Sequence, residues 1–459
     1  MGIFDPFERK MKRDGLPAVA IDTFRHYYEQ LERGATGLLF ESEIEPVHDL
    51  PDASELEGFA AAGSRALPRT VVIKLNGGLG TSMGMTRAKS LLPAKGGFTF
   101  LEIIARQVLE LRERHECELP LVLMNSFRTR DDSLAALAAF SELAGDIPGD
   151  FLQHRVPKIR ADDLAPVEWT KDPELEWCPP GHGDIYTALV TSGMLGALRA
   201  AGITYAFVSN SDNLGAVVDL EILGWFATQR TPFLMEVTDR TEADKKGGHL
   251  ARLADGKFVL REVAQCPPDE IDAFQDTRRY RYFNTNTLWI DLAQLEETLR
   301  SRDHVLGLPM IRNLKTADPA DEASPRVIQL ETAMGAAISV FEGSRAIRVS
   351  RDRFLPVKTT NDLLALWSDV YDLTEDFRVI PADTRAVGDL LIDLDPAHYR
   401  RVDQLELRFP HGAPSLRECR SLRVRGDVRF GGGVRIRGRA ELTQEGAEPR
   451  MIPDREVIG

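Results

Sequence analysis

The chain has 459 residues, of which 57 are Lys or Arg and 71 are Asp or Glu, so its formal net charge is −14. This acidic balance argues against sequence-independent nucleic-acid binding, which needs a positive surface to displace counterions from phosphates. A hydrophobic content of 43% is typical of a globular protein. The length suffices for two or three domains and excludes a small binding module.

The remaining composition favours a cytoplasmic protein. The N-terminus lacks the apolar region of a signal peptide, and no apolar run approaches the roughly 18 residues of a membrane span. The cysteines lie far apart without a C-x-x-C pair, which fits reduced thiols better than disulfides; they are Cys117, Cys178, Cys266 and Cys419. We therefore expect a soluble cytoplasmic protein that binds neither nucleic acid nor a membrane.

Strand and helix patterns alternate along most of the chain. Residues 1–67 are predicted to form a helical segment that ends in a tether. Apolar β-branched runs predict strands at 71–75, 119–124, 205–209 and 233–237, and helical spacing predicts helices at 101–116, 132–143 and 220–229. Such alternation indicates an α/β fold with right-handed crossovers and a mainly parallel sheet covered on both faces.

Two features depart from this alternation. Residues 249–253 and 257–263 flank Ala254-Asp-Gly256, a hairpin signal, so we expect an antiparallel ribbon that projects from the sheet. Apolar residues also recur every six positions near the C-terminus, which predicts short β-helix coils; they are Leu416, Leu422, Val428, Val434 and Ala440. We therefore divide the chain into residues 1–67, a catalytic domain at 68–380 and a β domain at 381–459.

The C-terminal β domain is rich in arginine. Charge runs usually form a solvated face, and here that face would lie on the outside of the coils. A surface for self-association is the alternative. The residues concerned are Arg417, Arg420, Arg423, Arg425, Arg429, Arg435, Arg437 and Arg439, with only Glu418 and Asp427 among them.

The glycine-rich segment that follows the strand at 71–75 is the most informative part of the sequence. Glycines let backbone N–H groups approach an anion or a base edge closely. A dinucleotide fingerprint that starts at Gly78 would need glycine where Met83 stands, and Gly-Lys-Ser/Thr after four spacers occurs nowhere. The loop is therefore neither of these common phosphate-binding motifs, and a purely structural turn remains the alternative.

Three charged residues strengthen a ligand-binding interpretation. Lys89 follows the loop and could reach phosphate oxygens, although most lysines simply lie on the surface. Asp212 follows the strand at 205–209, where α/β sheets bind ligands, and could hold a hard cation such as Mg²⁺; a turn-forming Asp is the alternative. Lys358 precedes a predicted helix near Asn361.

Seven motifs, in order, resemble the UTP:glucose-1-phosphate uridylyltransferases of the eukaryotic type. The resemblance runs from about residue 20 to the C-terminus. It implies a GT-A-like nucleotidyltransferase core followed by a left-handed β-helix. The motifs are Lys74-Leu-Asn-Gly-Gly-Leu-Gly-Thr-Ser-Met-Gly84, Met124-Asn-Ser-Phe127, Pro179-Pro-Gly-His-Gly-Asp184, Asn210-Ser-Asp-Asn-Leu-Gly215, Phe283-Asn-Thr-Asn286, Leu330-Glu-Thr-Ala333 and Arg353-Phe-Leu-Pro-Val-Lys358.

The resemblance also implies roles for individual residues. Lys89 and Lys358 match the catalytic lysines that contact the nucleotide, and Asp212 matches the residue that binds Mg²⁺ and the nucleotide. Further nucleotide contacts would come from Leu75, Asn76, Gly77, Gly78, Gln153 and Gly181, with Gln153 reading the uracil. The sugar phosphate and hexose would contact His182, Asn210, Ser211, Glu262 and Asn286.

The implied reaction joins UTP and glucose 1-phosphate to UDP-glucose with release of pyrophosphate. Met85-Thr-Arg-Ala-Lys-Ser90 departs from the family's Cys-Lys-Gly-Pro-Lys-Ser, and Lys358-Thr-Thr-Asn-Asp362 departs from Lys-Ala-Thr-Ser-Asp. Three alternatives remain. The first is a pyrophosphorylase for another UDP-sugar or UDP-N-acetylhexosamine, which Thr81-Ser-Met-Gly84 disfavours. The others are a non-catalytic nucleotide-sugar sensor, which would be expected to lack a lysine or Asp212, and a Rossmann dehydrogenase.

Overall fold

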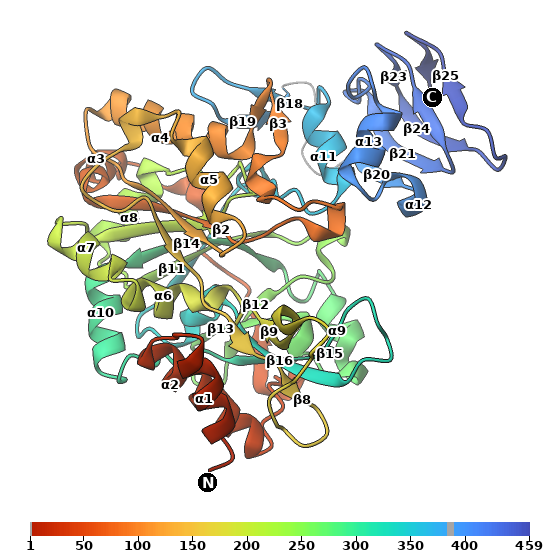
Figure 1. Cartoon of the computed structure of the whole chain (residues 1–459). Coiled ribbons are helices and arrows are strands. Elements are labelled where there is room, and N and C mark those ends of the chain that lie inside the picture. Colours follow the sequence, from red (N-terminus) through yellow and green to blue (C-terminus); the bar gives the residue numbers. More distant parts are fainter. Residues whose placement is uncertain (1, 383–389) are drawn as a thin grey trace.

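The computed structural model describes residues 2–382 and 390–459, and a large mixed sheet forms its centre (Figure 1). Its main strand order is β1-β12-β14-β10-β2-β5-β6, while β11 and β17 extend from β14 and β13 pairs with β12. The strands are β1 (Ile44–Pro46), β2 (Thr70–Asn76), β5 (Leu121–Asn125), β6 (Asp150–Leu152), β10 (Tyr205–Asn210), β11 (Phe233–Asp239), β12 (His249–Leu253), β13 (Phe258–Arg261), β14 (Tyr282–Asp291) and β17 (Arg345–Arg348).

The sheet has a parallel part and an antiparallel part. Strand β2 lies between β5 and β10 and runs parallel to both, and β6 continues this arrangement beyond β5. Strand β14 runs antiparallel to both β10 and β11. The predicted α/β fold is confirmed, with the four predicted strands at β2, β5, β10 and β11.

Helices cover both faces of the sheet. In β2, Val72 belongs to the same apolar cluster as residues of α3, α4, α8 and α11, whereas Val71 and Ile73 belong to a second cluster with residues of α6, α7 and α10. Successive side chains of a strand point to opposite faces, so a continuous apolar run is buried on both sides. The helices are α3 (Ala60–Ala66), α4 (Phe100–His115), α5 (Arg130–Leu137), α6 (Ile185–Thr191), α7 (Met194–Ala200), α8 (Leu220–Thr228), α9 (Ile271–Gln275), α10 (Leu292–Arg300) and α11 (Thr360–Trp367).

The predicted hairpin at 249–263 forms but does not project from the sheet. Strand β12 pairs with β13 as expected and also with β1 and β14, so the ribbon is part of the main sheet. The expectation of a projecting ribbon was therefore wrong. The sequence near the hairpin could not reveal the pairing with β1, because β1 comes from the N-terminal segment, far away in sequence. That segment also contains α3, which packs on α8 so closely that a Cβ atom on Gly63 would lie 2.0 Å from the Leu220 carbonyl oxygen.

The N-terminal helices α1 (Asp5–Arg13) and α2 (Ala18–Glu32) pack near a second, smaller sheet. This sheet has the order β15 (Met310–Thr316), β16 (Arg326–Thr332) and β8 (Ile159–Arg160), and all its pairs are antiparallel. None of the described helices is both long and apolar enough to pass through a bilayer.

The C-terminal segment forms stacked coils that lie apart from the main sheet (Figure 1). Its strands pair in parallel in three separate ladders. In the first, β21 (Cys419–Arg425) lies between β20 (Leu391–Leu394) and β24 (Gly438–Thr443). The other two ladders pair β22 (Val428–Phe430) with β25 (Arg450–Ile452) and β23 (Arg435–Ile436) with β26 (Val457–Ile458). Helices α12 (Pro396–Tyr399) and α13 (Val402–Arg408) precede β21.

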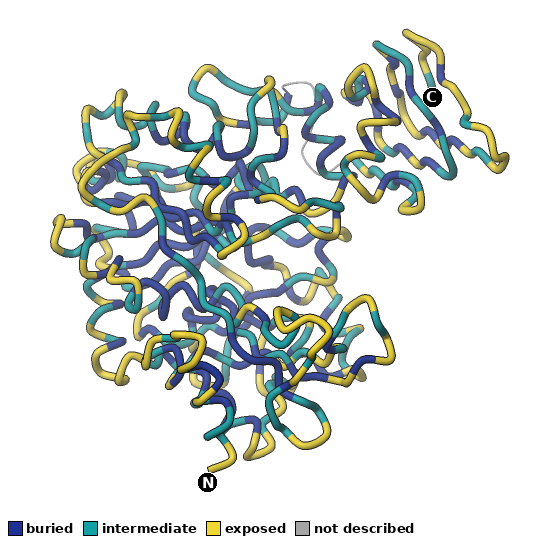
Figure 2. The backbone as a smooth tube through the Cα atoms, viewed as in Figure 1, coloured by how far each residue is buried: buried dark blue, intermediate teal, exposed yellow. Residues whose placement is uncertain are grey.

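The six-residue period marks the interior of these coils. Leu422 pairs with Ala440, eighteen residues later, so three six-residue steps make one coil. All five residues of the period are buried, at 5% exposure or less, whereas most of the arginines between them are exposed. Buried and exposed stretches alternate along the backbone of these coils (Figure 2). The predicted boundary at 380/381 falls at the end of β19 (Val379–Pro381), and residues 383–389 just after it lie outside the described part of the chain.

Candidate active site

The glycine-rich loop follows β2 at the carboxyl end of the parallel strands. Strand β2 pairs with β5 as far as Asn76, after which the chain leaves the sheet. Gly80 and Gly84 have φ angles of 64° and 76° on either side of a short 3₁₀ turn, a conformation that glycine adopts at low cost. A Cβ atom on Gly78 would meet nothing within 4 Å. The loop therefore exposes backbone where a ligand can approach.

Gln153 lies directly against this loop. A Cβ atom on Gly77 would be 2.7 Å from Oε1 of Gln153, so only glycine leaves room for the amide. The side chain of Asn76 points away from the loop into the core, where its amide donates to Asn125 Oδ1 and Ser133 Oγ at 2.8 Å each. The structure thus brings Gln153 and the loop together, while Asn76 can offer a ligand only its backbone.

Lys89 and Asp212 meet beside the loop, although they are far apart in sequence. Lys89 Nζ lies 2.5 Å from Asp212 Oδ2, and the backbone N–H of Lys89 donates to the Gly78 carbonyl oxygen at 3.0 Å. Asp212 Oδ1 is buried and, within the described residues, has no hydrogen-bond partner. A buried carboxylate oxygen of this kind is stabilised when a donor or a cation reaches it. The site therefore has one lysine in position and one free carboxylate oxygen.

This free oxygen fits a hard cation. Mg²⁺ prefers oxygen ligands and is commonly held by one or two carboxylates together with substrate phosphates. The described residues contain no cluster of three or more His, Cys, Asp or Glu that could hold a metal without substrate. Asp212 therefore suits Mg²⁺ bound jointly by protein and nucleotide.

Lys358 is held next to Asp212 by the backbone. The N–H of Val357 donates to the Asp212 carbonyl oxygen at 3.1 Å, and the neighbouring Asn213 accepts from the N–H of Leu355 at 2.8 Å. The Lys358 side chain is exposed, with its Nζ 6.0 Å from the centroid of the Phe283 ring. A second cation therefore stands at the same sheet edge as Lys89.

Gly181 and His182 form the next wall of the site. Gly181 has a φ of 81°, and a Cβ atom there would lie 2.4 Å from the Thr332 carbonyl oxygen. His182 Nδ1 accepts the N–H of Met334 at 2.9 Å, and burial lowers the pKa of His182 to about 4. The ring is therefore neutral at pH 7 and carries its proton on Nε2, which makes Nε2 a hydrogen-bond donor.

The residues expected around the sugar come from four different elements. Ser211 follows β10 and donates its N–H to the Leu75 carbonyl oxygen at 3.1 Å, and Asn210 pairs with Leu75 in the sheet. Glu262 follows β13; burial raises the pKa of its carboxyl, an effect that the nearby Lys358 charge opposes. Asn286 lies at an irregularity in the pairing of β11 with β14.

Asn286 has a left-handed backbone conformation with a φ of 56°. It exchanges two hydrogen bonds of 2.9 Å with Asn284, one to each residue's side-chain oxygen. Asparagine adopts such conformations more readily than most residues other than glycine. The two hydrogen bonds therefore fix the orientation of the Asn286 amide, the predicted sugar contact.

Sequence reasoning did not assign a role to the buried charges beneath the site. Arg353 donates to both carboxylate oxygens of Glu236 at 2.8 Å and to the Val217 carbonyl oxygen at 2.8 Å. Lys74 Nζ donates to Ser209 Oγ and the Ala216 carbonyl oxygen, and burial, reinforced by the Arg353 charge, lowers the pKa of Lys74 to about 7. These two side chains hold the turn that follows Asp212. Both occur in the quoted motifs, but sequence cannot show that they face inward.

The chain matches a protein-family model over residues 21–437, and the family is described as UTP--glucose-1-phosphate uridylyltransferase. It is 40% identical over 400 residues to the UTP--glucose-1-phosphate uridylyltransferase of Solanum tuberosum, a match that covers 87% of this chain and 82% of the relative. It is likewise 40% identical to the Saccharomyces cerevisiae enzyme of that name, over 85% of this chain and 77% of the relative.

Solved structures agree with these sequence matches. A single-residue mutant of UDP-glucose pyrophosphorylase from Leishmania major, in complex with UDP-glucose, superposes with a TM-score of 0.93 at 43% identity, covering 100% of this chain and 98% of that chain. A UDP-glucose phosphorylase from Trypanosoma brucei has a TM-score of 0.90 at 44% identity and coverages of 100% and 99%. The chain therefore belongs to the UTP--glucose-1-phosphate uridylyltransferase family.

Proposed function

We propose that this protein transfers the uridylyl group of UTP to glucose 1-phosphate and releases pyrophosphate. The observation that carries the proposal is the Lys89–Asp212 ion pair beside the open backbone of Gly78, with Asp212 Oδ1 free of partners among the described residues. This arrangement offers cationic and metal-binding groups where a triphosphate would lie. The family membership of the chain supports the same reaction.

A phosphate oxygen of glucose 1-phosphate attacks the α-phosphorus of UTP, and the bond from that phosphorus to the bridging oxygen of the β-phosphate breaks. The attacking phosphate is already an anion, so the chain needs no general base. Its task is to align two anions and to offset charge on the departing pyrophosphate. The electron pair of the broken bond leaves with the pyrophosphate.

The site residues divide this task. The backbone of Leu75 to Gly78 and the amide of Gln153 bind the nucleotide, together with Gly181. Lys89 leaves Asp212 to contact the triphosphate, and Lys358 neutralises charge from the opposite side of the Asp212 turn. His182 donates from Nε2 to the sugar phosphate, because Met334 already occupies Nδ1. Hexose hydroxyls would meet Asn210, Ser211, Glu262 and Asn286.

Asp212 would hold Mg²⁺ through Oδ1. When bound, the ion would supply charge neutralisation for the phosphate oxygens. When the ion binds, Lys89 would give up its contact with Asp212 Oδ2 and would contact the triphosphate instead.

Several broader features belong to the same proposal. The C-terminal coils are a left-handed β-helix, with residues 68–380 as the GT-A-like catalytic domain, and the protein works in the cytoplasm. The exposed arginines of the coils form either a solvated face or a self-association surface. Light scattering on the full chain and on a chain ending before residue 381 would separate these two possibilities, because association through the coils would give the full chain a multiple of its monomer mass and leave the shorter chain at its monomer mass.

One assay tests the central proposal. Purified protein is incubated with Mg²⁺, each nucleoside triphosphate in turn and a series of hexose 1-phosphates, and pyrophosphate release is measured. We expect the highest kcat/KM with UTP and glucose 1-phosphate. A higher value with N-acetylglucosamine or galactose 1-phosphate would shift the proposal to a sister pyrophosphorylase, and binding of UDP-glucose without turnover would reduce the protein to a sensor.

A further inference from the structure

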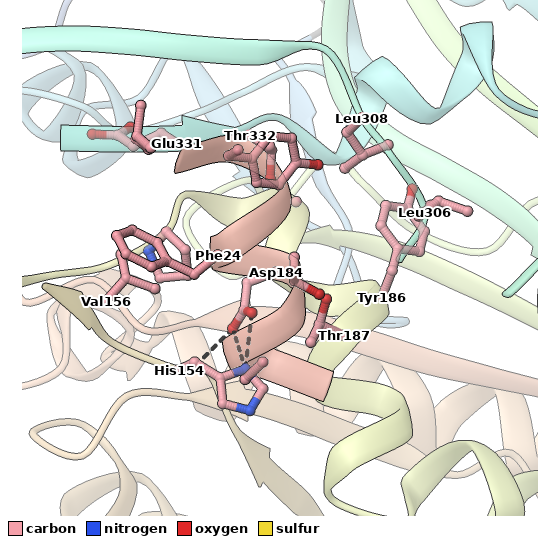
Figure 3. A pocket seen from close by; sticks show the side chains of 16 residues that line it. Phe24, His154, Val156, Asp184, Tyr186, Thr187, Leu306, Leu308, Glu331 and Thr332 are labelled. Atoms are coloured by element: carbon pink, nitrogen blue, oxygen red, sulfur yellow. Dashed lines mark hydrogen bonds and ion pairs between the residues drawn. The ribbon is translucent and has the colours of Figure 1, made fainter. Parts of the chain in front are cut away.

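His154 and Asp184 form a buried pair (Figure 3) close in the chain to the candidate site residues Gln153 and His182. His154 Nδ1 lies 2.8 Å from Asp184 Oδ1, and the backbone N–H of His154 donates to Asp184 Oδ2 at 2.6 Å. On the other side of the ring, Nε2 lies 3.0 Å from Thr191 Oγ1. One carboxylate thus holds both the backbone and the ring of His154.

The pair connects two segments that the proposed function assigns to different parts of the substrates. His154 follows Gln153, whose N–H still pairs with Asn125 at the sheet edge. At His154 the chain leaves the sheet, and Asp184 takes over as acceptor for its N–H. Asp184 comes two residues after His182 and directly precedes α6. The contact therefore joins the segment of Gln153 to the turn of His182.

The surroundings keep this pair away from solvent. The side chains of His154 and Asp184 are 11% and 5% exposed. They line a cavity of about 30 Å³ beneath α2, which has room for about two water molecules and not for a substrate. The cavity wall also includes Tyr27 and Leu330, together with Phe24, Val156 and Leu308 (Figure 3). The pair therefore acts on the protein itself and not directly on a ligand.

Electrostatics make each partner dependent on the other. Burial alone would lower the pKa of His154, but the charge and hydrogen bond of Asp184 outweigh burial and raise it. A carboxylate that is 5% exposed would be costly without a donor. Loss of the His154 ring removes its donor on one side and leaves the backbone N–H of residue 154, whereas loss of the Asp184 carboxylate removes the acceptors of both bonds. Loss of the ring therefore weakens the link between the two segments, and loss of the carboxylate releases it.

We propose that His154 and Asp184 are positioning residues that fix Gln153 relative to His182 and thereby align the uracil with the sugar phosphate. This inference rests on the proposed function, because the roles of Gln153 and His182 come from there. Residues that position substrate groups can change rates about 10²-fold through shifts of about 1 Å. The pair would therefore influence nucleotide selection without touching the nucleotide.

The test compares His154→Ala with His154→Asn in the full chain. Alanine removes the ring, whereas the asparagine amide can still donate to Asp184. For His154→Ala we expect KM for UTP to rise about tenfold, and the preference for UTP over CTP in kcat/KM to fall about tenfold. His154→Asn should recover most of both. Asp184→Ala should be at least as severe as His154→Ala.

Glu176→Ala provides a matched control. Glu176 is also a mostly buried carboxylate (15% exposed) that links distant segments, through Lys10 and the N–H of Trp169. The Glu176→Ala variant should lose about as much thermal stability as His154→Ala, while its KM for UTP and its preference for UTP over CTP stay unchanged. If Glu176→Ala alters them equally, or if His154→Ala keeps both within about twofold of the parent, the positioning role is refuted.

A fourth variant separates this inference from the proposed function. Gln153→Ala should itself lose the preference for UTP over CTP. If it does and His154→Ala does not, the positioning role fails and the function stands. If Gln153→Ala selects UTP normally, the assignment of Gln153 to uracil fails, and the pair is then judged by KM for glucose 1-phosphate, which must rise in His154→Ala and recover in His154→Asn.

Discussion

The carboxyl edge of the parallel strands and the C-terminal coils use backbone in opposite ways. At the strand edge, the chain leaves regular pairing at Asn76 and Asn210, and glycines and turns carry it away from the sheet. In the coils, short strands pair in three parallel ladders and each interior position of the six-residue period is filled by an apolar side chain.

The two regions also differ in their charged groups. Among the described residues, the strand edge has a buried carboxylate oxygen without a hydrogen-bond partner, on Asp212, and an exposed lysine, Lys358. In the coils, exposed arginines pair with neighbouring carboxylates, as Arg437 does with Glu418 at 2.7 Å. The candidate ligand-binding groups therefore lie where the backbone is irregular, and the coils contribute packing.

The largest expected effect is at the strand edge. Lys358→Ala should lower kcat by about 10² or more, because a cation that offsets developing charge is lost, while thermal stability changes little since the side chain is exposed. Steady-state pyrophosphate release checks this. Lys171, whose side chain is 73% exposed and pairs with Asp321, is the matched control, and Lys171→Ala should leave kcat unchanged. Near-normal turnover of Lys358→Ala would contradict the assignment.

The converse effect is expected in the coils. Leu422→Ala removes a fully buried side chain and should reduce the stability of this region by about 2–5 kcal/mol, while KM for UTP stays the same. Hydrogen exchange of the amides in β21 and β24 measures the loss. Leu407→Ala, at a side chain that is 52% exposed, should cost less than about 0.5 kcal/mol. Equal losses in the two variants would show that the period does not define the interior.

A smaller effect is expected at the free carboxylate. Asp212→Asn keeps the shape of the side chain but removes its charge, so the Mg²⁺ concentration that gives half-maximal rate should rise about tenfold, in line with typical losses at metal sites. A magnesium titration of the rate at saturating substrates measures this shift. An unchanged magnesium dependence would remove Asp212 from the metal site.

The smallest effect concerns the antiparallel side of the core. His249 is fully buried in β12 and stacks on Tyr280, with ring centroids 3.9 Å apart. Burial, reinforced by the charges of Arg240 and Arg261, lowers the pKa of His249 well below its usual value. Below about pH 6.5 the unfolded chain therefore binds a proton that the folded protein does not, so stability falls with falling pH by up to about 1.4 kcal/mol per unit.

His249→Leu should remove this dependence. Urea unfolding at a series of pH values between about 5 and 8 measures this. Below about pH 6 the unfolding free energy of the variant should change less steeply with pH than that of the parent, by the equivalent of up to about one bound proton, whatever the stability of the variant at pH 8. Identical slopes for the variant and the parent would mean that the folded protein also protonates His249, contrary to the burial argument.

The sequence by itself determined the local elements and the family, and it supplied the candidate residues for the site. Apolar runs and helical spacing located β2, β5, β10 and α4 to within a few residues, because each depends on contacts within a short stretch of chain. The six-residue period likewise identified the coil interior. The motifs around Gly78, Asp212 and Lys358 were recognisable because each is contiguous.

The tertiary structure decided which of these parts meet. The Lys89–Asp212 contact spans 123 residues, and the Glu236–Arg353 pair spans 117; no local pattern encodes such distances. The hairpin at β12 and β13 was expected to project because nothing near it in sequence revealed that β1 would cover its edge. Pairing between segments that are far apart in sequence depends on how their buried faces pack together, and this packing exists only in the folded chain.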